Sequence, residues 1–160
     1  TDALFPMYAD PETRQYFPEG TQTYEETKSE VAWFINKGYA LHGYGLWATV
    51  DKATGMVIGR CGLLSWEING KQETEVAYLL GKKYWGHGLA TEAARGIVQY
   101  AYETLDIPRL ICLVDPDRQG LVVKSCSLQK RALLFLYCSL FISNQQPTSY
   151  CMGQRWKHSL

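Results

Sequence analysis

The fold is decided by residues 79–94, which read LLGKKYWGHGLATEAA. The leading leucines predict the end of a strand, Gly86 and Gly88 mark a loop, and the alanine-rich end predicts a helix from about Ala90. Glycine lets the backbone adopt positive φ and come close to a ligand, and the first N–H groups of a helix have no partner inside it. The turn therefore predicts an anion site, and diphosphate is a common anion that several N–H donors bind at once.

Two familiar diphosphate motifs do not fit this loop. A dinucleotide-binding turn requires a third glycine three residues after the second, and Thr91 stands there. A Walker-type phosphate loop requires lysine directly after its second glycine, but the spacing from Gly81 to Gly86 is followed by His87. The chain is therefore not predicted to belong to either nucleotide-binding class.

The residues that remain in the loop carry a resemblance. Lys83, Gly86, Gly88 and Ala90 resemble the acyl-CoA pyrophosphate loop of GNAT-type N-acetyltransferases, with lysine at a position usually held by glutamine or arginine. Residues 84–93, YWGHGLATEA, are similar to the branch that includes the ribosomal-protein N-terminal acetyltransferases. The resemblance implies an α/β (α+β) fold with a mixed, mostly antiparallel sheet flanked by helices, and acetyl-CoA as co-substrate.

The resemblance assigns acyl-CoA binding to residues in and before the loop. They are Leu79, Leu80, Lys83, Tyr84, Trp85, Gly86, His87, Gly88, Leu89, Ala90 and Thr91. Lys83 is expected to reach phosphate by its amide or its ammonium group. Two of these side chains have an alternative role that does not involve the ligand. Trp85 is expected to wedge into the core rather than stack on adenine, and Thr91 can be an N-terminal helix hydroxyl.

Acetyl transfer also needs a base or a water path, because an amine with a pKa near ~10.4 is protonated at neutral pH. Residues 75–78, EVAY, resemble the family's E-[IV]-[GA]-Y strand pattern, so Glu75 is the candidate base; the alternative is a solvated strand residue. Tyr78, on the opposite face, is expected to pack in the core. In the family a backbone N–H near Leu79 or Leu80 binds the oxyanion.

Helix-start signals precede the strands. Asp10 followed by Pro11 predicts one short helix. Thr23 and Glu26 form a capping box, which predicts a second helix that runs to about residue 38. In the family a strand precedes this helical region, and residues 1–4 do not supply it: either this sequence begins late or an edge strand is missing.

The middle of the chain predicts a loop and then an antiparallel meander. Residues 38–45, GYALHGYG, predict a loop, and because the family's acceptor lies beside this neighbourhood, His42 is a substrate-side candidate. Asn69 and Gly70 form the strongest short hairpin signal between β-rich runs. The predicted strands are residues 46–50, 56–67 and 73–80.

After the glycine loop, apolar residues at helical spacing predict an amphipathic helix that Pro108 terminates. Residues 110–114 then predict a short central strand. The resemblance implies that this strand runs parallel to the one entering the loop and splays from it, opening the slot that holds pantetheine.

The resemblance covers residues 4–117 and stops there. All 16 acidic residues lie in residues 1–117, and residues 118–160 contain none. The family expects Asn near Arg118 and Ser near Leu121, followed by a helix and a closing hairpin. We hypothesise that residues 118–160 are translated out of the ancestral frame or otherwise replaced, which the other frames of the coding DNA would test. We expect one acyl-CoA N-acyltransferase domain over residues 1–160, with 118–160 atypical.

Composition limits the other classes. The 160 residues are 46% apolar, as in one globular domain, and their net charge of zero gives no general attraction to nucleic acid or membrane. The longest apolar run, residues 132–142, is about half of the ~20 residues that a membrane helix needs, so we expect a cytoplasmic protein. The five cysteines lack C-x-x-C spacing, and no metal is expected.

These observations favour an acetyl-CoA-dependent N-acetyltransferase that works by direct attack in a ternary complex. Peptide N-termini, polyamines, aminoglycosides and small amino compounds all remain possible acceptors. One alternative is a non-catalytic CoA-binding remnant with impaired activity. Another is a protein completed by a partner, as a homodimer, because open sheet edges can pair between protomers.

Overall fold

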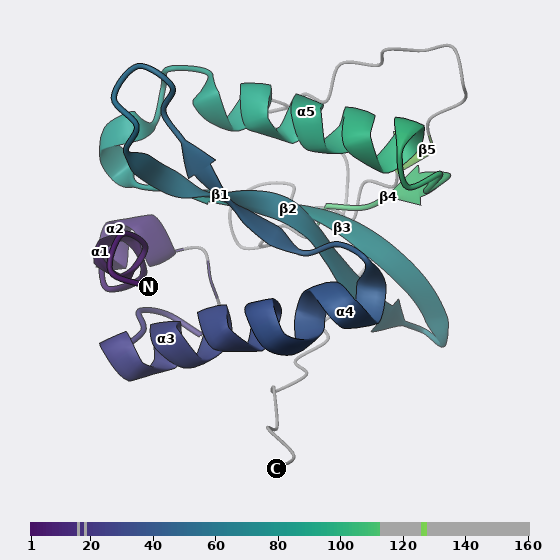
Figure 1. The fold of residues 1–160 in the computed structure, drawn as a ribbon, viewed down its shortest axis with the longest axis horizontal. Helices are drawn as coiled ribbons and strands as arrows, with labels where there is room; N and C mark the ends of the chain where they lie inside the picture. The colour runs from purple at the N-terminus through teal and green to yellow at the C-terminus, as the bar shows by residue number, and fades with distance from the viewer. Residues whose placement is uncertain (16, 18, 113–125, 128–160) are drawn as a thin grey trace, which may run out of the picture.

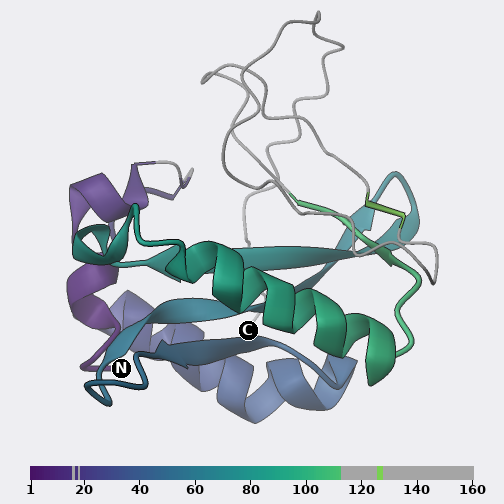
Figure 2. The same ribbon diagram turned by 90° about the horizontal axis from the view of Figure 1, so that it is seen from above.

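In the computed structural model, residues 1–15, 17, 19–112 and 126–127 are described, and structural statements below concern these residues. A three-stranded sheet lies between two helical layers (Figures 1 and 2). The helix that follows the glycine loop, α5 (Leu89–Glu103), covers one face. The opposite face is covered by α3 (Tyr24–Trp33) and α4 (Tyr39–His42), as expected for an α+β fold.

The N-terminal helices begin where their caps predict. The helix α1 (Phe5–Tyr8) is followed by α2 (Pro11–Arg14), in which Asp10 accepts hydrogen bonds from the backbone N–H groups of Glu12 and Thr13. The capping box at α3 is complete: the Thr23 hydroxyl accepts from the Glu26 N–H, and the Glu26 carboxylate accepts from the Thr23 N–H. Both predicted helix starts are confirmed.

The prediction of a loop over residues 38–45 is wrong for its first half. A π-helical turn, η1 (Phe34–Gly38), continues α3 directly into α4. Gly38 does not end the helix, because the Trp33 and Phe34 rings pack against it; a Cβ there would lie 2.9 Å from Trp33. The helix ends instead at Gly43, whose φ of 73° is left-handed and whose N–H donates to the Tyr39 carbonyl.

The predicted meander is confirmed. Its strands are β1 (Leu46–Val50), β2 (Val57–Ile68) and β3 (Lys71–Leu80), which pair antiparallel in that order. Asn69 and Gly70 have φ of 52° and 73°, as a two-residue type I′ turn requires, and this tight turn sets the register of β2 against β3. The strand β3 begins at Lys71, two residues before its predicted start.

A short strand follows α5. The strand β4 (Arg109–Leu110) pairs antiparallel with β5 (Cys126–Ser127), and the adjacent Ile111 forms a parallel bridge with Glu75 in β3. The parallel direction expected for residues 110–114 is therefore observed at Ile111, while residues 113–114 lie outside the described part. The hypothesis about residues 118–160 likewise falls outside it, apart from β5.

The main core lies between the sheet and α5. Its fully buried members are Leu63 and Ala101, and Val76, Ala94 and Leu110 join them. The alanines leave room for the α5 backbone to approach the sheet closely. Within the described residues, no helix is long and apolar enough to cross a membrane.

Candidate active site

The site begins on β3, at its bridge to Ile111, the residue that follows β4. The Val76 N–H donates to the Ile111 carbonyl at 2.9 Å, and the Ile111 N–H donates to the Thr74 carbonyl at 2.8 Å. Residues 113–125, which follow this bridge in the chain, lie outside the described part.

The register shows which backbone groups of β3 face away from β2. The Gly81 N–H donates to the Ile58 carbonyl in β2, whereas the Val76 N–H points to β4. Since ladder bonds alternate along a strand, odd-numbered backbone groups face β2 and even-numbered groups face away from it. Of the two residues predicted to hold the oxyanion donor, Leu80 therefore directs its N–H away from β2, and Leu79 directs its N–H toward β2.

The glycine loop follows directly. A short 3-10 turn, η2 (Lys82–Tyr84), leads to Gly86 and Gly88, which both have φ of 77° and thus need glycine. Gly88 is the N-cap of α5 and supplies no side-chain cap. The leading amides of this 15-residue helix therefore point into the loop without a capping side chain, which is favourable for an anion.

Two lysines flank the loop. The Lys83 ammonium lies 4.9 Å from the centroid of the Tyr84 ring, a cation–π contact; Lys83 is exposed and Tyr84 is half-buried. Lys82 forms an ion pair with Glu12, and its N–H donates to the Thr13 hydroxyl at 3.3 Å. The α2 helix therefore braces the loop, and Figure 2 shows α1 and α2 beside it.

The expectation that Trp85 wedges into the core is wrong. Its side chain is 38% exposed, and its indole N–H donates to the Leu80 carbonyl at 2.7 Å. The ring is held at the surface because this hydrogen bond ties it to the end of β3. His87 is also exposed, whereas Leu89, Ala90 and Thr91 are half-buried in the first turn of α5.

Glu75 lies on the face of β3 that turns toward the N-terminal helices. It is only 7% exposed, and its carboxylate accepts a hydrogen bond of 2.6 Å from the Trp66 indole N–H. On the same face, Leu79 packs on Met7 and Tyr8 of α1. The alternative of a solvated strand residue is therefore wrong for Glu75, because its side chain is buried and bonded to Trp66.

Tyr78 lies on the other face, as predicted, and packs against the main core. Side-chain direction alternates along β3, so Val76 and Tyr78 face α5 while Glu75 does not. A direct role for Tyr78 beside Glu75 is thus disfavoured by its direction.

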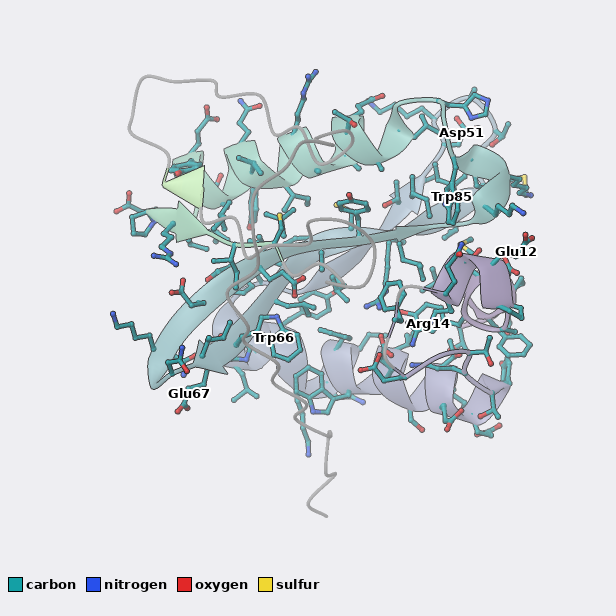
Figure 3. All side chains as sticks on the ribbon, turned by 180° about the vertical axis from the view of Figure 1, so that it is seen from behind. Glu12, Arg14, Asp51, Trp66, Glu67 and Trp85 are labelled. Atoms are coloured by element: carbon teal, nitrogen blue, oxygen red, sulfur yellow. The ribbon has the colours of Figure 1, made fainter. Side chains whose placement is uncertain are left out.

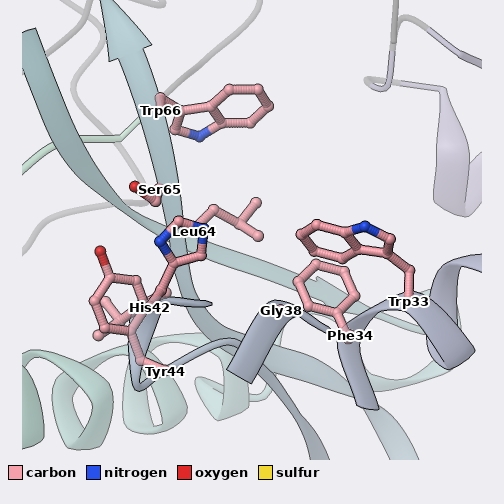
Figure 4. Close-up of a pocket in the computed structure, with 9 residues that line it drawn as sticks. Trp33, Phe34, Gly38, His42, Tyr44, Leu64, Ser65 and Trp66 are labelled. Carbon is pink, nitrogen blue, oxygen red and sulfur yellow. The ribbon is translucent and has the colours of Figure 1, made fainter. Parts of the chain in front are cut away.

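An aromatic pocket adjoins Glu75 (Figure 4). It is lined by residues of α3, η1, the end of α4 and β2: Trp33, Phe34, Gly38, His42, Tyr44, Leu63, Leu64, Ser65 and Trp66. Of these, only His42 was a sequence candidate. A signal for Trp66 was available, since the Asn69–Gly70 turn pairs Trp66 with Glu73 and Leu64 with Glu75.

The loop and the pocket occupy different ends of the same sheet. Figure 3 shows Trp85 near Glu12 and Arg14 at one end, and Trp66 with Glu67 toward the other. The Glu75 carboxylate lies at the Trp66 end, and the uncapped helix amides lie at the Trp85 end. Such a separation suits one long ligand with an anionic head and a reactive tail.

A buried polar cluster fastens the helical layer to β2. The Glu30 carboxylate accepts hydrogen bonds from Tyr8 at 2.9 Å and Gln22 at 2.8 Å, and it pairs with Arg60 at 3.1 Å. Burial raises the pKa of the Tyr8 hydroxyl far above its usual value, and burial lowers the pKa of the neighbouring Arg14. The cluster is therefore a structural support for the face that carries Glu75.

The described part of the chain contains no candidate metal site. Groups of three or more His, Cys, Asp or Glu side chains suitable for a metal ion are absent there.

Comparisons with known proteins agree with this geometry. The family model of the acetyltransferase (GNAT) domain matches residues 1–121. The chain is 30% identical over 116 residues to the Bacillus subtilis protein YkkB, covering 71% of this chain and 65% of that protein. It is 30% identical over 137 residues to the Bacillus licheniformis N-acetyltransferase p20, covering 83% of this chain and 75% of the relative.

A solved structure is similar to this chain in fold and sequence. An acetyltransferase from Agrobacterium tumefaciens superposes with a TM-score of 0.60 and 26% identity, over 72% of this chain and 64% of that one. A further relative, 31% identical over 109 residues, is the FsC-acetyl coenzyme A-N(2)-transacetylase of Aspergillus fumigatus, of which 46% is covered. The chain thus spans about two thirds or less of several of these relatives.

Proposed function

Because the chain belongs to the GNAT family of acetyltransferases, we propose that it transfers an acetyl group from acetyl-CoA to a primary amine. The acceptor is an amine of a small molecule or of a protein N-terminus, and it attacks directly in a ternary complex. The observation that carries the proposal is the uncapped N-terminus of α5, which lies behind two glycines of positive φ and follows β3 in the chain.

The loop holds the diphosphate in this proposal. The backbone N–H groups around Gly86, Gly88 and Ala90 donate to phosphate oxygens, and the positive end of the helix dipole adds a modest attraction. The Lys83 ammonium is near enough to the loop to leave the Tyr84 ring for a phosphate. Leu89 and Thr91 shape the first turn of α5, and Trp85 keeps the end of β3 in place through the Leu80 carbonyl.

In this proposal the thioester and the amine react between the Leu80 N–H and the Glu75 carboxylate. Glu75 accepts the ammonium proton, directly or through a water, and the amine nitrogen then forms a bond with the thioester carbonyl carbon. The Leu80 N–H stabilises the oxyanion of the tetrahedral intermediate. After the attack the nitrogen of the tetrahedral intermediate loses a second proton to solvent. As the C–S bond breaks, the sulfur leaves as a thiolate whose conjugate acid has a pKa of ~8.5, and the thiolate takes up a proton from solvent.

A second candidate function is a non-catalytic CoA-binding remnant. It is favoured by one observation, the complete lack of acidic residues in residues 118–160, where the family expects a helix and a closing hairpin. In this alternative the diphosphate loop binds CoA, and no acceptor is acetylated.

Thermal unfolding and thiol release together separate the two candidates. Acetyl-CoA at 100 times its Kd should stabilise the protein by about 2.7 kcal/mol and raise Tm. An active enzyme also releases thiol when a panel of primary amines is added. A raised Tm without thiol release supports the remnant, and no change in Tm at millimolar acetyl-CoA contradicts both candidates.

A further inference from the structure

The glycine loop leaves the sheet through a turn that a distant side chain holds. The η2 turn closes through two backbone bonds, from the Tyr84 N–H to the Gly81 carbonyl at 2.9 Å and from the Trp85 N–H to the Lys82 carbonyl at 3.0 Å. The N–H of Lys82, the first residue of the turn, donates instead to the Thr13 hydroxyl at 3.3 Å. Thr13 lies 69 residues earlier in the chain, so this bond joins the loop to α2 and is not part of the turn itself.

The Thr13 hydroxyl is itself fixed in direction. The residue is only 1% exposed, and its hydroxyl donates its single proton to the Asp10 carboxylate. This bond lowers the pKa of Asp10, which also caps α2 by accepting from the backbone N–H groups of Glu12 and Thr13. Because its proton is committed to Asp10, the hydroxyl oxygen can meet Lys82 only as an acceptor. The three groups therefore form one directed chain, from the Lys82 N–H through Thr13 to Asp10.

Apolar contacts press the same segment against α1. Gly81 is buried directly before Lys82, and a Cβ built on it would lie 3.4 Å from the Met7 side chain. Leu79, at the end of β3, belongs to the same buried cluster as Met7. The ion pair between Lys82 and Glu12 is a weaker link, since its side chains are 49% and 62% exposed and exposed pairs contribute little. The buried Thr13 hydroxyl is therefore the contact expected to fix the direction in which the loop leaves β3.

This contact matters because the loop beyond it contains two glycines. Gly86 and Gly88 both have φ of 77°, and glycine loses more conformational freedom on ordering than any other residue. Figure 2 shows α1 and α2 beside the segment that joins β3 to α5. A loop whose entry is already held gives up less conformational entropy when several of its N–H groups converge on one diphosphate. Holding Lys82 thus favours binding without adding a contact to the ligand.

Resting on the proposed function, we propose that Thr13 is a positioning residue for the diphosphate loop. Its hydroxyl holds the Lys82 N–H and so keeps the loop in the conformation that binds acetyl-CoA. Thr13 acts through Lys82 and not on the reacting groups, which are the Glu75 carboxylate and the Leu80 N–H. Removal of the hydroxyl therefore weakens acetyl-CoA binding and leaves the chemical step of bound acetyl-CoA in place.

The first test is Thr13→Val in the full chain, which replaces the hydroxyl with a methyl group. We expect the Kd for acetyl-CoA from calorimetric titration to rise about 3- to 10-fold, the effect of one hydrogen bond, with kcat from thiol release at saturating acetyl-CoA within about twofold. Thr27→Val is the matched control, because Thr27 is equally buried and its hydroxyl donates within α3, to the Thr23 carbonyl at 3.0 Å. Thr13→Ser keeps the hydroxyl and should restore the affinity. An unchanged Kd in Thr13→Val, or an equal rise in Thr13→Ser or Thr27→Val, overturns the inference and leaves the proposed function standing.

Amide hydrogen exchange of the ligand-free full chain, measured by NMR, separates failure of this inference from failure of the proposed function. In the wild type the Lys82 amide should exchange at least about tenfold more slowly than in an unstructured peptide of the same sequence. In Thr13→Val the Tyr84 and Trp85 amides, which close η2, should exchange about 3- to 10-fold faster than in Thr27→Val.

An unprotected Lys82 amide in the wild type overturns the inference even if Thr13→Val does not fold. Equal exchange of the Tyr84 and Trp85 amides in Thr13→Val and Thr27→Val overturns it as well. A wild type that binds no acetyl-CoA contradicts the proposed function, and the exchange rates then still decide whether Thr13 holds the loop.

Discussion

The burial and hydrogen bonding of the Glu75 carboxylate depend on its neighbours in the fold. Its carboxylate is held at 2.6 Å by the Trp66 indole and is largely removed from water, although it lies in a strand of alternating polarity. A buried carboxylate held in a fixed direction is a candidate for proton transfer.

We expect Glu75→Gln to lower turnover at neutral pH by about 10²–10⁴, the usual contribution of a general base, with a smaller loss at high pH where free amine is abundant. The measurement is the pH–rate profile of thiol release. Glu67→Gln is the matched control, since Glu67 lies in β2 and is exposed. A profile that is the same in Glu75→Gln and wild type would reject the role of Glu75 as base.

Cys61 gives a prediction about stability at alkaline pH. Burial raises the pKa of its thiol to about 11 from the ordinary 9.0. The folded state thus holds the thiol proton more tightly, so this stabilisation is complete below pH 9 and is lost as the pH rises toward 11. Two pKa units correspond to roughly 2–3 kcal/mol in the free energy of unfolding.

The check is urea unfolding of wild type and Cys61→Ala between pH 8 and pH 11. Other titrating groups are common to both proteins, so the difference between their free energies of unfolding isolates the thiol. We expect the wild type to lose its stability relative to Cys61→Ala as the pH rises. A difference that stays constant over this range would contradict the prediction.

At the scale of elements, the strand–loop–helix unit from β3 to α5 works through its backbone. Gly86 and Gly88 both have φ of 77°, and Gly88 is the N-cap of α5. A side chain at such a position is strained by about 1–2 kcal/mol because its Cβ approaches the following carbonyl. A substitution in the loop combines this backbone strain with a loss of ligand contacts. The same substitution at a glycine of the same conformation elsewhere in the chain measures the strain alone.

We expect Gly88→Ala to weaken acetyl-CoA binding by about 10- to 150-fold, the effect of losing one hydrogen bond to a charged group, in addition to the strain. Gly55→Ala is the control, because Gly55 has φ of 70° in the β1–β2 turn and equally open surroundings. Calorimetric titration gives both affinities. If Gly55→Ala weakens binding as much as Gly88→Ala, the loop has no special role.

For the whole molecule, stability depends on the core that joins the sheet to α5. Leu63 is fully buried in the cluster with Val76 of β3, Ala94 and Ala101 of α5, and Leu110. Leu63→Ala should lower the free energy of unfolding by about 2–5 kcal/mol, because it removes buried methyl groups and leaves a cavity. Ile35→Ala, at a position 65% exposed, should change it by about 0.5 kcal/mol or less.

Urea unfolding measures both variants. A loss in Leu63→Ala no larger than that in Ile35→Ala would mean that the sheet and α5 do not share one core. The Tm increase with acetyl-CoA gives a second readout, since a folded Leu63→Ala should keep the loop that lies outside the core.

Much of the architecture could be predicted because its signals lie within short stretches of sequence. The capping box of Thr23 and Glu26, the turn of Asn69 and Gly70, and the glycines of the loop each act within four residues, so their patterns can be read directly. The continuation of α3 through Gly38 was missed, because the packing of Trp33 and Phe34 on that glycine outweighs its helix-ending tendency.

Local backbone preferences and side-chain alternation were enough to predict the main helices and strands and the glycine loop, and the resemblance of residues 75–78 to a family strand pattern made Glu75 a candidate. The folded structure was needed to show that Leu80 rather than Leu79 directs its N–H away from β2, that Trp85 lies at the surface and that the Trp66 indole bonds to Glu75. These facts depend on strand register and on contacts between separate layers, which a linear pattern does not contain.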